Sequence, residues 1–258
     1  MTQTALRLLL CAGVAAALPA QAAEPGWAHY GGDAGGQRYS LAAQINVANV
    51  ARLKPAWSYS TGDLASKGAA MKRAAFENTP ILDEGKLFVC SPFDEVSALD
   101  PGTGKQIWRY DPHINDDPDI DYPNSFNCRG VAYWKDANGH GRIFLGTNDR
   151  RLIALDAATG KPIDSFGRHG TILIYAGKLA RPGQMQITSA PLVTNGIVVV
   201  GSSLDDNQRV DELPGTVHAY DAMTGVPKWS FDPLAIAHER AGAANVWAPI
   251  SADDARGL

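Results

Sequence analysis

The sequence has no excess of basic residues. Its 23 lysines and arginines are outnumbered by 27 aspartates and glutamates, which gives a formal net charge of -4. Proteins that bind nucleic acid usually present a basic surface to the phosphate backbone, and this composition does not supply one. We therefore expect no nucleic-acid partner.

Patterns that bind metals or haem are also missing. The six histidines are scattered without an i, i+4 pair, and no Cys-x-x-Cys-His haem motif occurs. These absences argue against a helical zinc site and leave the route of any electron transfer unassigned. Cysteine is scarce too, with only three in the chain.

Long apolar runs are absent as well. The run from Leu8 to Leu18 is about half the roughly 20 residues that a membrane-spanning helix needs. Arg7 precedes it, and the small residues Ala20 and Ala22 follow it in a cleavage-like pattern. We expect residues 1–23 to be a cleaved export signal and residues 24–258 to form one periplasmic domain.

Two cysteines remain after removal of that signal, Cys90 and Cys128. An oxidising compartment permits a disulfide between them, but Cys90 also ends an apolar run typical of a buried strand. The sequence leaves both interpretations open, a disulfide or two buried thiols.

The sequence has little amphipathic helix periodicity, and it contains an internal repeat instead. Three segments share an Asp-x-x-Thr-Gly core that follows a short apolar run: Ala98–Trp108, Ala154–Ile163 and Ala219–Trp229. The repeat spacing is 56 residues from Asp100 to Asp156 and 65 from Asp156 to Asp221. Such periods indicate stacked supersecondary units.

Each copy has the pattern of a β-hairpin. A strand leads to the Asp-x-x-Thr-Gly turn, where glycine takes a positive φ at little cost, and a second strand follows that ends in a large aromatic residue. The middle copy departs, with Asp164 in place of the tryptophan and Phe166 nearby. We expect its contact with the next unit to be weaker or differently placed.

These units predict an all-β fold, a β-propeller of radially arranged blades. With four strands and about 60 residues per blade, residues 24–258 supply about four blades. A half-propeller leaves unpaired strand edges. We therefore interpret the chain as a truncated part of a larger propeller.

Several motifs carry a resemblance to a known family. The first of them are Trp27–Asp33, Gly36–Ser40, Gln44–Asn46, Ala56–Asp63, Phe76–Pro80 and Cys128–Tyr133, and the match continues in Ile187–Pro191, Val200–Asn207 and Asn245–Pro249. Together they resemble the opening of the pyrroloquinoline-quinone (PQQ) dependent dehydrogenases, in particular the glucose, quinate and polyol enzymes. The resemblance implies an eight-bladed propeller that holds PQQ and a divalent cation, usually Ca²⁺, and that oxidises alcohols or sugars by hydride transfer.

The resemblance also implies roles for individual residues. Glu77 matches a carboxylate that contacts the cofactor, and Arg129 matches the guanidinium that faces its carboxylates and quinone oxygens. Thr188 matches a hydroxyl that bonds a cofactor carboxylate, and Trp247 matches the indole on which the ring system lies. Asp206, with Asp205 beside it, matches the cation ligand.

The family's catalytic Asp, its second cation ligand and a cationic residue beside the quinone belong to later blades. We therefore expect no catalytic residue before Leu258 and no turnover by this chain alone. Ser125 matches neither the vicinal cysteine pair of the alcohol enzymes nor the histidine of the glucose enzymes, so the substrate stays open. The electron acceptor, a quinone or a cytochrome of the periplasm or membrane, stays open as well.

Each proposed site residue also has a simpler interpretation. Glu77 and Arg129 are equally typical of a strand-end ion pair, Thr188 of a turn, Asp206 of a solvated loop and Trp247 of an aromatic between blades. Their occurrence in order within one family pattern favours the site. The alternative for the whole chain is a non-enzymatic propeller scaffold of the outer-membrane assembly type, which has no reason to keep these residues together.

Overall fold

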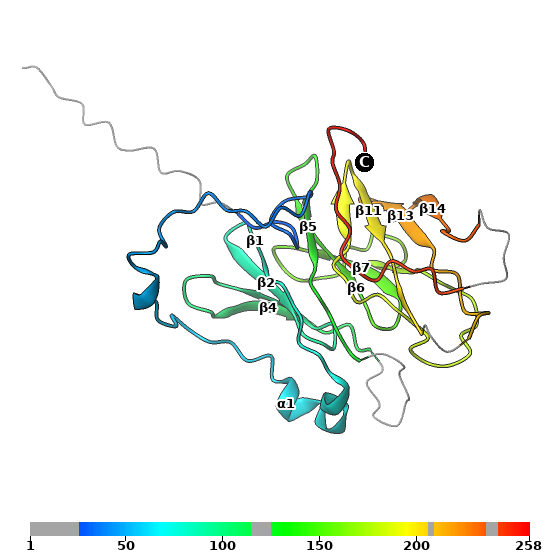
Figure 1. Ribbon diagram of the computed structural model, residues 1–258, viewed down its shortest axis with the longest axis horizontal. Helices are drawn as coiled ribbons and strands as arrows, with labels where there is room; N and C mark the ends of the chain where they lie inside the picture. The colour runs from blue at the N-terminus through cyan, green and yellow to red at the C-terminus, as the bar shows by residue number, and fades with distance from the viewer. Residues whose placement is uncertain (1–25, 115–124, 206–208, 236–241) are drawn as a thin grey trace, which may run out of the picture.

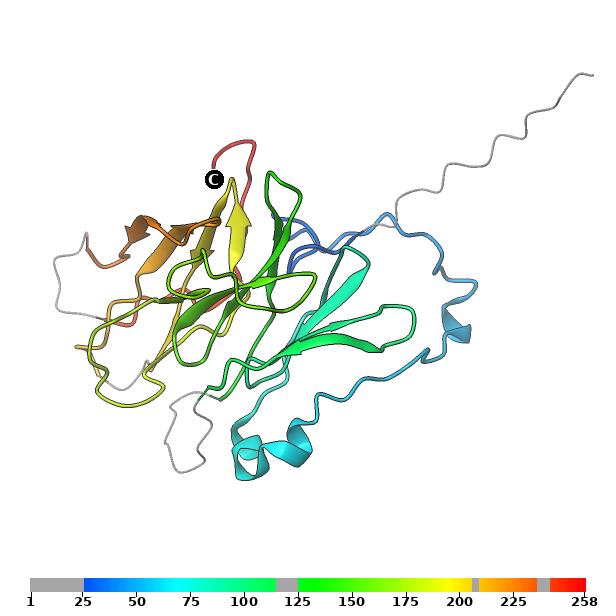
Figure 2. The ribbon, with the colours of Figure 1, turned by 180° about the vertical axis from the view of Figure 1, so that it is seen from behind.

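Three antiparallel sheets make up most of the regular structure. The computed structural model describes residues 26–114, 125–205, 209–235 and 242–258. Each of the three sheets has four strands that pair in the order of the sequence. Figure 1 and Figure 2 show the sheets side by side, with the first at one end of the row and the third at the other.

We call these sheets blades one, two and three. Blade one consists of β1 (Ile81–Asp83), β2 (Lys86–Cys90), β3 (Val96–Leu99) and β4 (Gln106–Tyr110). Blade two consists of β5 (Ala132–Lys135), β6 (Gly141–Gly146), β7 (Arg151–Asp156) and β8 (Thr171–Leu173). Blade three consists of β10 (Leu192–Thr194), β11 (Ile197–Val200), β13 (Val217–Asp221) and β14 (Pro227–Phe231).

The remaining elements are short. β9 (Met185–Gln186) and β12 (Ser203–Leu204) pair with each other beside blade three. A four-residue helix, α1 (Asp63–Ser66), and two 3-10 helices, Val50–Arg52 and Gly68–Arg73, lie before blade one. Among the described residues, no helix is long and apolar enough to cross a membrane.

The blade architecture is the one predicted from the repeats, but the number of blades differs. The repeat length predicted about four, and the described residues form three. The difference lies in residues 26–80, where the short helices are joined by irregular backbone. This segment adds no four-stranded sheet of its own.

The hydrophobic core lies between neighbouring blades. In β7, Ile153 and Leu155 belong to the cluster shared with blade one, whereas Leu152 and Ala154 belong to the cluster shared with blade three. Successive side chains of a strand point to opposite faces of the sheet, so a strand between two blades is buried at every position, whether its residues are apolar or, like Arg142, polar. This explains why all six residues of β6 are buried.

The Asp-x-x-Thr-Gly turns of the three blades share one set of hydrogen bonds. In each turn the aspartate Oδ1 accepts from the backbone N–H and the hydroxyl of the threonine, at 2.7–3.0 Å. The aspartate carbonyl accepts from the glycine N–H at 2.8 Å, and the glycines Gly104, Gly160 and Gly225 have φ near +70°. The predicted turn is therefore confirmed in all three copies. In the middle copy, however, the residues after the turn form only a bridge between Leu155 and Pro162, and the fourth strand, β8, begins at Thr171.

A tryptophan from an earlier part of the chain packs against two of these turns. Trp57 Nε1 donates to the carbonyl of Pro101 at 3.0 Å, and Trp108 Nε1 donates to the carbonyl of Ala157 at 3.1 Å. Both acceptors directly follow the turn aspartate. The indole of Trp108 also covers Gly160, leaving no room there for a side chain. Blades one and two are thus joined by an aromatic residue.

The junction between blades two and three uses an arginine instead. Arg142 of β6 is buried, and its Nη1 donates to the carbonyls of Ala222 and Met223 at 3.3 and 2.9 Å. Ala222 follows the turn aspartate as Ala157 does in blade two. The predicted difference of the middle copy is therefore real, because a guanidinium supplies the N–H donor that the indole supplies elsewhere.

We expect the substitution Gly160→Ala to destabilise the fold more than Gly85→Ala. Both glycines have positive φ, +71° and +66°, but an added Cβ would lie 2.5 Å from Trp108 at Gly160 and in open space at Gly85. The backbone strain costs about 1–2 kcal/mol at either position, and overpacking adds about 1–3 kcal/mol at Gly160. Urea unfolding of both variants measures the difference, and equal losses would contradict this account of the junction.

The two cysteines form a disulfide between the first two blades. Cys90 ends β2, and Cys128 lies in the segment that leads into β5, with 6.1 Å between their Cα atoms. Both residues are buried. Of the two interpretations that the sequence left open, the structure shows the disulfide.

Candidate functional site

Three irregular segments that lead into the blades lie side by side. They precede β1, β5 and β10, the first strands of the three blades, and β5 contacts both β1 and β10. Thr79 N–H donates to the carbonyl of Arg129, and Arg129 N–H donates to the carbonyl of Thr188, both at 2.9 Å. This backbone ladder brings side chains from three distant parts of the sequence to one place.

Arg129 is the centre of this group. Its Nη2 lies 3.0 Å from Glu77 Oε2, and its Nη1 donates to Thr188 Oγ1 at 2.7 Å. Its Cζ lies 5.1 Å from the centroid of the Trp247 ring, which is a cation–π distance. One guanidinium therefore contacts an acid, a hydroxyl and an indole that the sequence analysis assigned to the same site.

Glu77 has a second partner that the sequence analysis did not identify. Asn127 Nδ2 donates to Glu77 Oε2 at 2.5 Å, so this oxygen receives both the amide and the guanidinium. The side chain of Glu77 is 49% exposed, whereas that of Arg129 is 18% exposed. Glu77 is thus anchored through one oxygen while half of its surface remains open to a ligand.

Trp247 comes from the C-terminal segment, which runs back across the blades (Figure 1). Its carbonyl accepts a hydrogen bond from Ser189 Oγ, and Asn245 Nδ2 donates to the carbonyl of Ser202 at 2.9 Å. These contacts fix the segment against residues 187–204. The indole itself is 51% exposed, so part of its surface is available for stacking.

These side chains surround a cavity of about 340 Å³. Its walls are formed by nine residues from all the segments just described: Ala75, Glu77, Ser125, Asn127, Arg129, Thr188, Ser203, Leu204 and Trp247. Residues 125, 127 and 129 alternate along extended backbone, which turns all three toward the same side. That alternation is the signal from which Asn127 was predictable once Arg129 had been identified.

The predicted cation ligand, Asp206, lies outside the described residues. Its neighbour Asp205 is buried and forms an ion pair with Arg181, next to a separate cavity. Among the residues that the structure describes, no three histidine, cysteine or acidic side chains form a metal-binding group. The site as described thus contains one cation, Arg129, and one anion, Glu77.

The chain resembles a family of known proteins over its whole described length. Residues 27–258 match the PQQ family model of the glucose/ethanol/alcohol dehydrogenase β-propeller domain. The glycerol dehydrogenase large subunit of Gluconobacter oxydans is 37% identical over 93% of this chain and 34% of its own length. The quinate/shikimate dehydrogenase (quinone) of Acinetobacter baylyi is 35% identical over 80% of this chain and 27% of its own length.

A solved structure gives the same result. The quinohemoprotein alcohol dehydrogenase from Comamonas testosteroni aligns with a TM-score of 0.66 and 35% identity, covering 81% of this chain and 27% of that one. The chain therefore spans about a third, or less, of the length of the relatives that it matches. The likeness supports the propeller fold that the repeats predicted.

Proposed function

Since the chain belongs to the PQQ family of glucose/ethanol/alcohol dehydrogenase β-propellers, we propose that the cavity around Arg129 binds PQQ in an enzyme that oxidises an alcohol, sugar or polyol. The observation that carries this proposal is the convergence on Arg129 of Glu77, Thr188 and Trp247. A scaffold propeller needs its turns and junctions, but it has no need for this group of side chains in one cavity.

The side chains present fit the chemistry of the cofactor. PQQ is a flat tricyclic acid with three carboxylates, and the cavity offers a planar guanidinium, the hydroxyl of Thr188 and an exposed indole surface. Guanidinium groups bind carboxylates through paired hydrogen bonds, and indoles stack on flat ring systems. The residues that we propose to hold the cofactor are Arg129, Thr188, Glu77 and Trp247.

Charge balance supports a divalent cation as well. Arg129 and Glu77 cancel each other, so the described part of the cavity does not neutralise a tri-acid. A hard cation such as Ca²⁺ would supply the missing charge, and carboxylate oxygens are its preferred ligands. We propose Asp206 as one such ligand on the family pattern.

When bound, the quinone supplies the acceptor for a hydride from the substrate C–H bond. The residues of this chain would bind and orient it: Arg129 and Thr188 would hold carboxylate groups, and Trp247 would offer its indole face to the rings. We further propose that residues 1–23 direct export to the periplasm and that a quinone or cytochrome there accepts the electrons.

Titration of the full-length protein with PQQ in the presence of Ca²⁺ tests this proposal. We expect saturable quenching of tryptophan fluorescence, reduced by Trp247→Leu but retained by Trp229→Leu, because both indoles are about half exposed and only Trp247 lines the cavity. Dye reduction with glycerol, glucose and quinate then identifies the substrate class. Absence of saturable quenching by wild-type protein would reject the proposal and favour the scaffold.

A further inference from the structure

A buried carboxylate lies behind the candidate site. Asp94 occupies the turn between β2 and β3, is fully buried and has a φ of +62°, a conformation that few non-glycine residues adopt. Its Oδ2 accepts hydrogen bonds from the backbone N–H and the Nδ2 of Asn148, at 2.7 and 2.9 Å. Burying an acid in an unusual backbone conformation costs free energy of folding, and such residues cluster at functional sites.

Asn148 connects Asp94 to the site. It is buried in the turn between β6 and β7, and its Oδ1 accepts from Gln186 Nε2 at 2.8 Å and from the backbone N–H of Asn127 at 3.4 Å. Asn127 in turn donates its own Nδ2 to Glu77 at 2.5 Å. A continuous series of hydrogen bonds therefore runs from Asp94 through Asn148 and Asn127 to Glu77.

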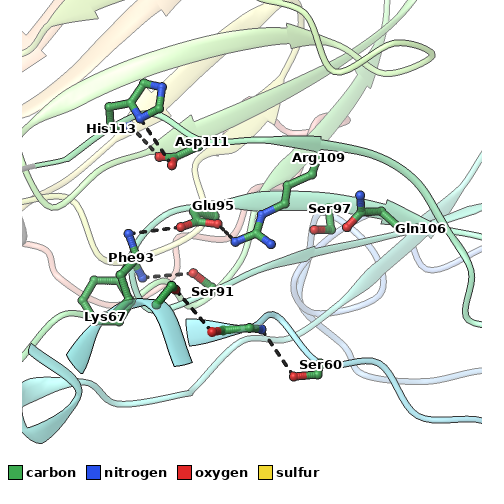
Figure 3. A network of polar contacts seen from close by, with 12 residues as sticks. Ser60, Lys67, Ser91, Phe93, Glu95, Ser97, Gln106, Arg109, Asp111 and His113 are labelled. Atoms are coloured by element: carbon green, nitrogen blue, oxygen red, sulfur yellow. Dashed lines mark hydrogen bonds and ion pairs between the residues drawn. The ribbon is translucent and has the colours of Figure 1, made fainter. Parts of the chain in front are cut away.

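Two further contacts hold the start of this series in place. The ring of Phe93, next to Asp94, packs 4.9 Å from the ring of Phe126, next to Asn127. Glu95, on the other side of Asp94, forms ion pairs with Lys67 and Arg109 (Figure 3). The turn that carries Asp94 is thus anchored on both sides, as a group that positions another residue must be.

The environment favours the un-ionised form of Asp94. Burial raises its pKa well above the usual value, and the hydrogen bonds from Asn148 oppose this rise only partly. Of the charged groups that act on it, Asp149 raises the pKa further and Arg151 lowers it. Because a single oxygen of Asp94, Oδ2, accepts both hydrogen bonds from Asn148, the carbonyl oxygen of an asparagine can replace it here.

We propose that Asp94 and Asn148 are positioning residues for the PQQ site, because together they fix the segment of Asn127 whose amide holds Glu77 beside Arg129. Neither residue lines the cavity, so their effect passes through Asn127 and Glu77. This inference rests on the proposed cofactor binding, and it adds to that proposal two residues that act from behind the site.

The test compares the affinity of the full-length protein for PQQ, with Ca²⁺ present, in four variants. Asn148→Leu and Asp94→Leu remove the hydrogen bonds and should each weaken PQQ binding about ten-fold. Asp94→Asn keeps an oxygen that accepts from Asn148 and should stay within about two-fold of wild type. Thr147→Val is the matched control, because Thr147 is equally buried but bonds through its hydroxyl only within its own turn.

A double-mutant cycle separates positioning from a general loss of stability. In a Glu77→Ala background the substitution Asn148→Leu should have no further effect on PQQ affinity, because the residue being positioned is gone. Urea unfolding of every variant shows whether affinity merely follows stability. If Asn148→Leu does not fold, Asn148→Ser, which leaves room for water, takes its place in the cycle.

Three results would overturn the inference. They are wild-type affinity in the Asn148 and Asp94→Leu variants, an equal loss in Thr147→Val, and an unchanged effect of the Asn148 substitution when Glu77 is absent. Failure of wild-type protein to bind PQQ would reject the proposed function and this inference together. Binding by wild type with any of the three results rejects the inference alone.

Discussion

Replacing Arg129 by methionine should weaken PQQ binding at least about 100-fold, because hydrogen bonds to charged groups contribute about 1.5–3 kcal/mol each. Arg129 contacts Glu77, Thr188 and Trp247 at once. In the proposed binding mode, its removal eliminates the cation that would face the carboxylates of PQQ. It also leaves the negative charge of Glu77 unopposed, which repels the same ligand.

Two control variants separate the effect of the paired N–H donors from that of the positive charge. Arg129→Lys keeps the charge but loses the paired donors, so we expect an intermediate loss of about ten-fold. Arg52→Met removes one positive charge from an exposed residue that does not line the cavity and should leave the affinity unchanged. Fluorescence titration measures all three, and wild-type affinity in Arg129→Met would show that the guanidinium has only a structural role.

Removing the disulfide should cost about 4 kcal/mol of the free energy of unfolding, the chain-entropy value for cysteines 38 residues apart. The Cys90→Ala/Cys128→Ala double variant, compared with wild type by urea unfolding, measures this loss. The site should weaken too, because Cys128 lies between Asn127 and Arg129, and Asn78 Nδ2 donates to Cys90 Sγ at 3.1 Å. Both ends of the bridge therefore adjoin residues that surround Glu77.

Reductant provides the control for this second experiment. It should destabilise the wild-type protein and leave the double variant unaffected, since only the former has a bond to reduce. A double variant that unfolds within about 1 kcal/mol of wild type would mean that the blade contacts alone hold the two segments together.

The local features of the fold were predictable from the sequence because their causes are local. The Asp-x-x-Thr-Gly turn closes on itself within five residues, so its hydrogen bonds follow from its own residues. The same holds for β7, whose successive side chains pack alternately against the two neighbouring blades because of strand geometry. The number of blades was less predictable, because it was estimated from chain length. Residues 26–80 contribute to that length but form no four-stranded sheet.

The site was predictable only in part. Glu77, Arg129, Thr188 and Trp247 were identified by family pattern, and the structure brings all four together. Asn127 was not identified, although its alternation with Arg129 was a usable signal. Asn148 and Asp94 had no such signal, because buried amides and acids have no sequence motif and the contact between these two joins positions 54 residues apart. The disulfide was undecided for a similar reason, since only the packing of two blades shows whether the cysteines meet.

The arginine at the junction of blades two and three affects how blade repeats of this kind can be detected in a sequence. Trp108 and Arg142 come from different positions in their repeats, yet both present a flat N–H group to the carbonyl that follows the turn aspartate. In this chain two different side chains thus donate to the carbonyl at the same position of the turn. A sequence profile that requires the aromatic residue would miss repeats whose junction is formed by an arginine. A profile that requires the aspartate, threonine and glycine of the turn would detect them.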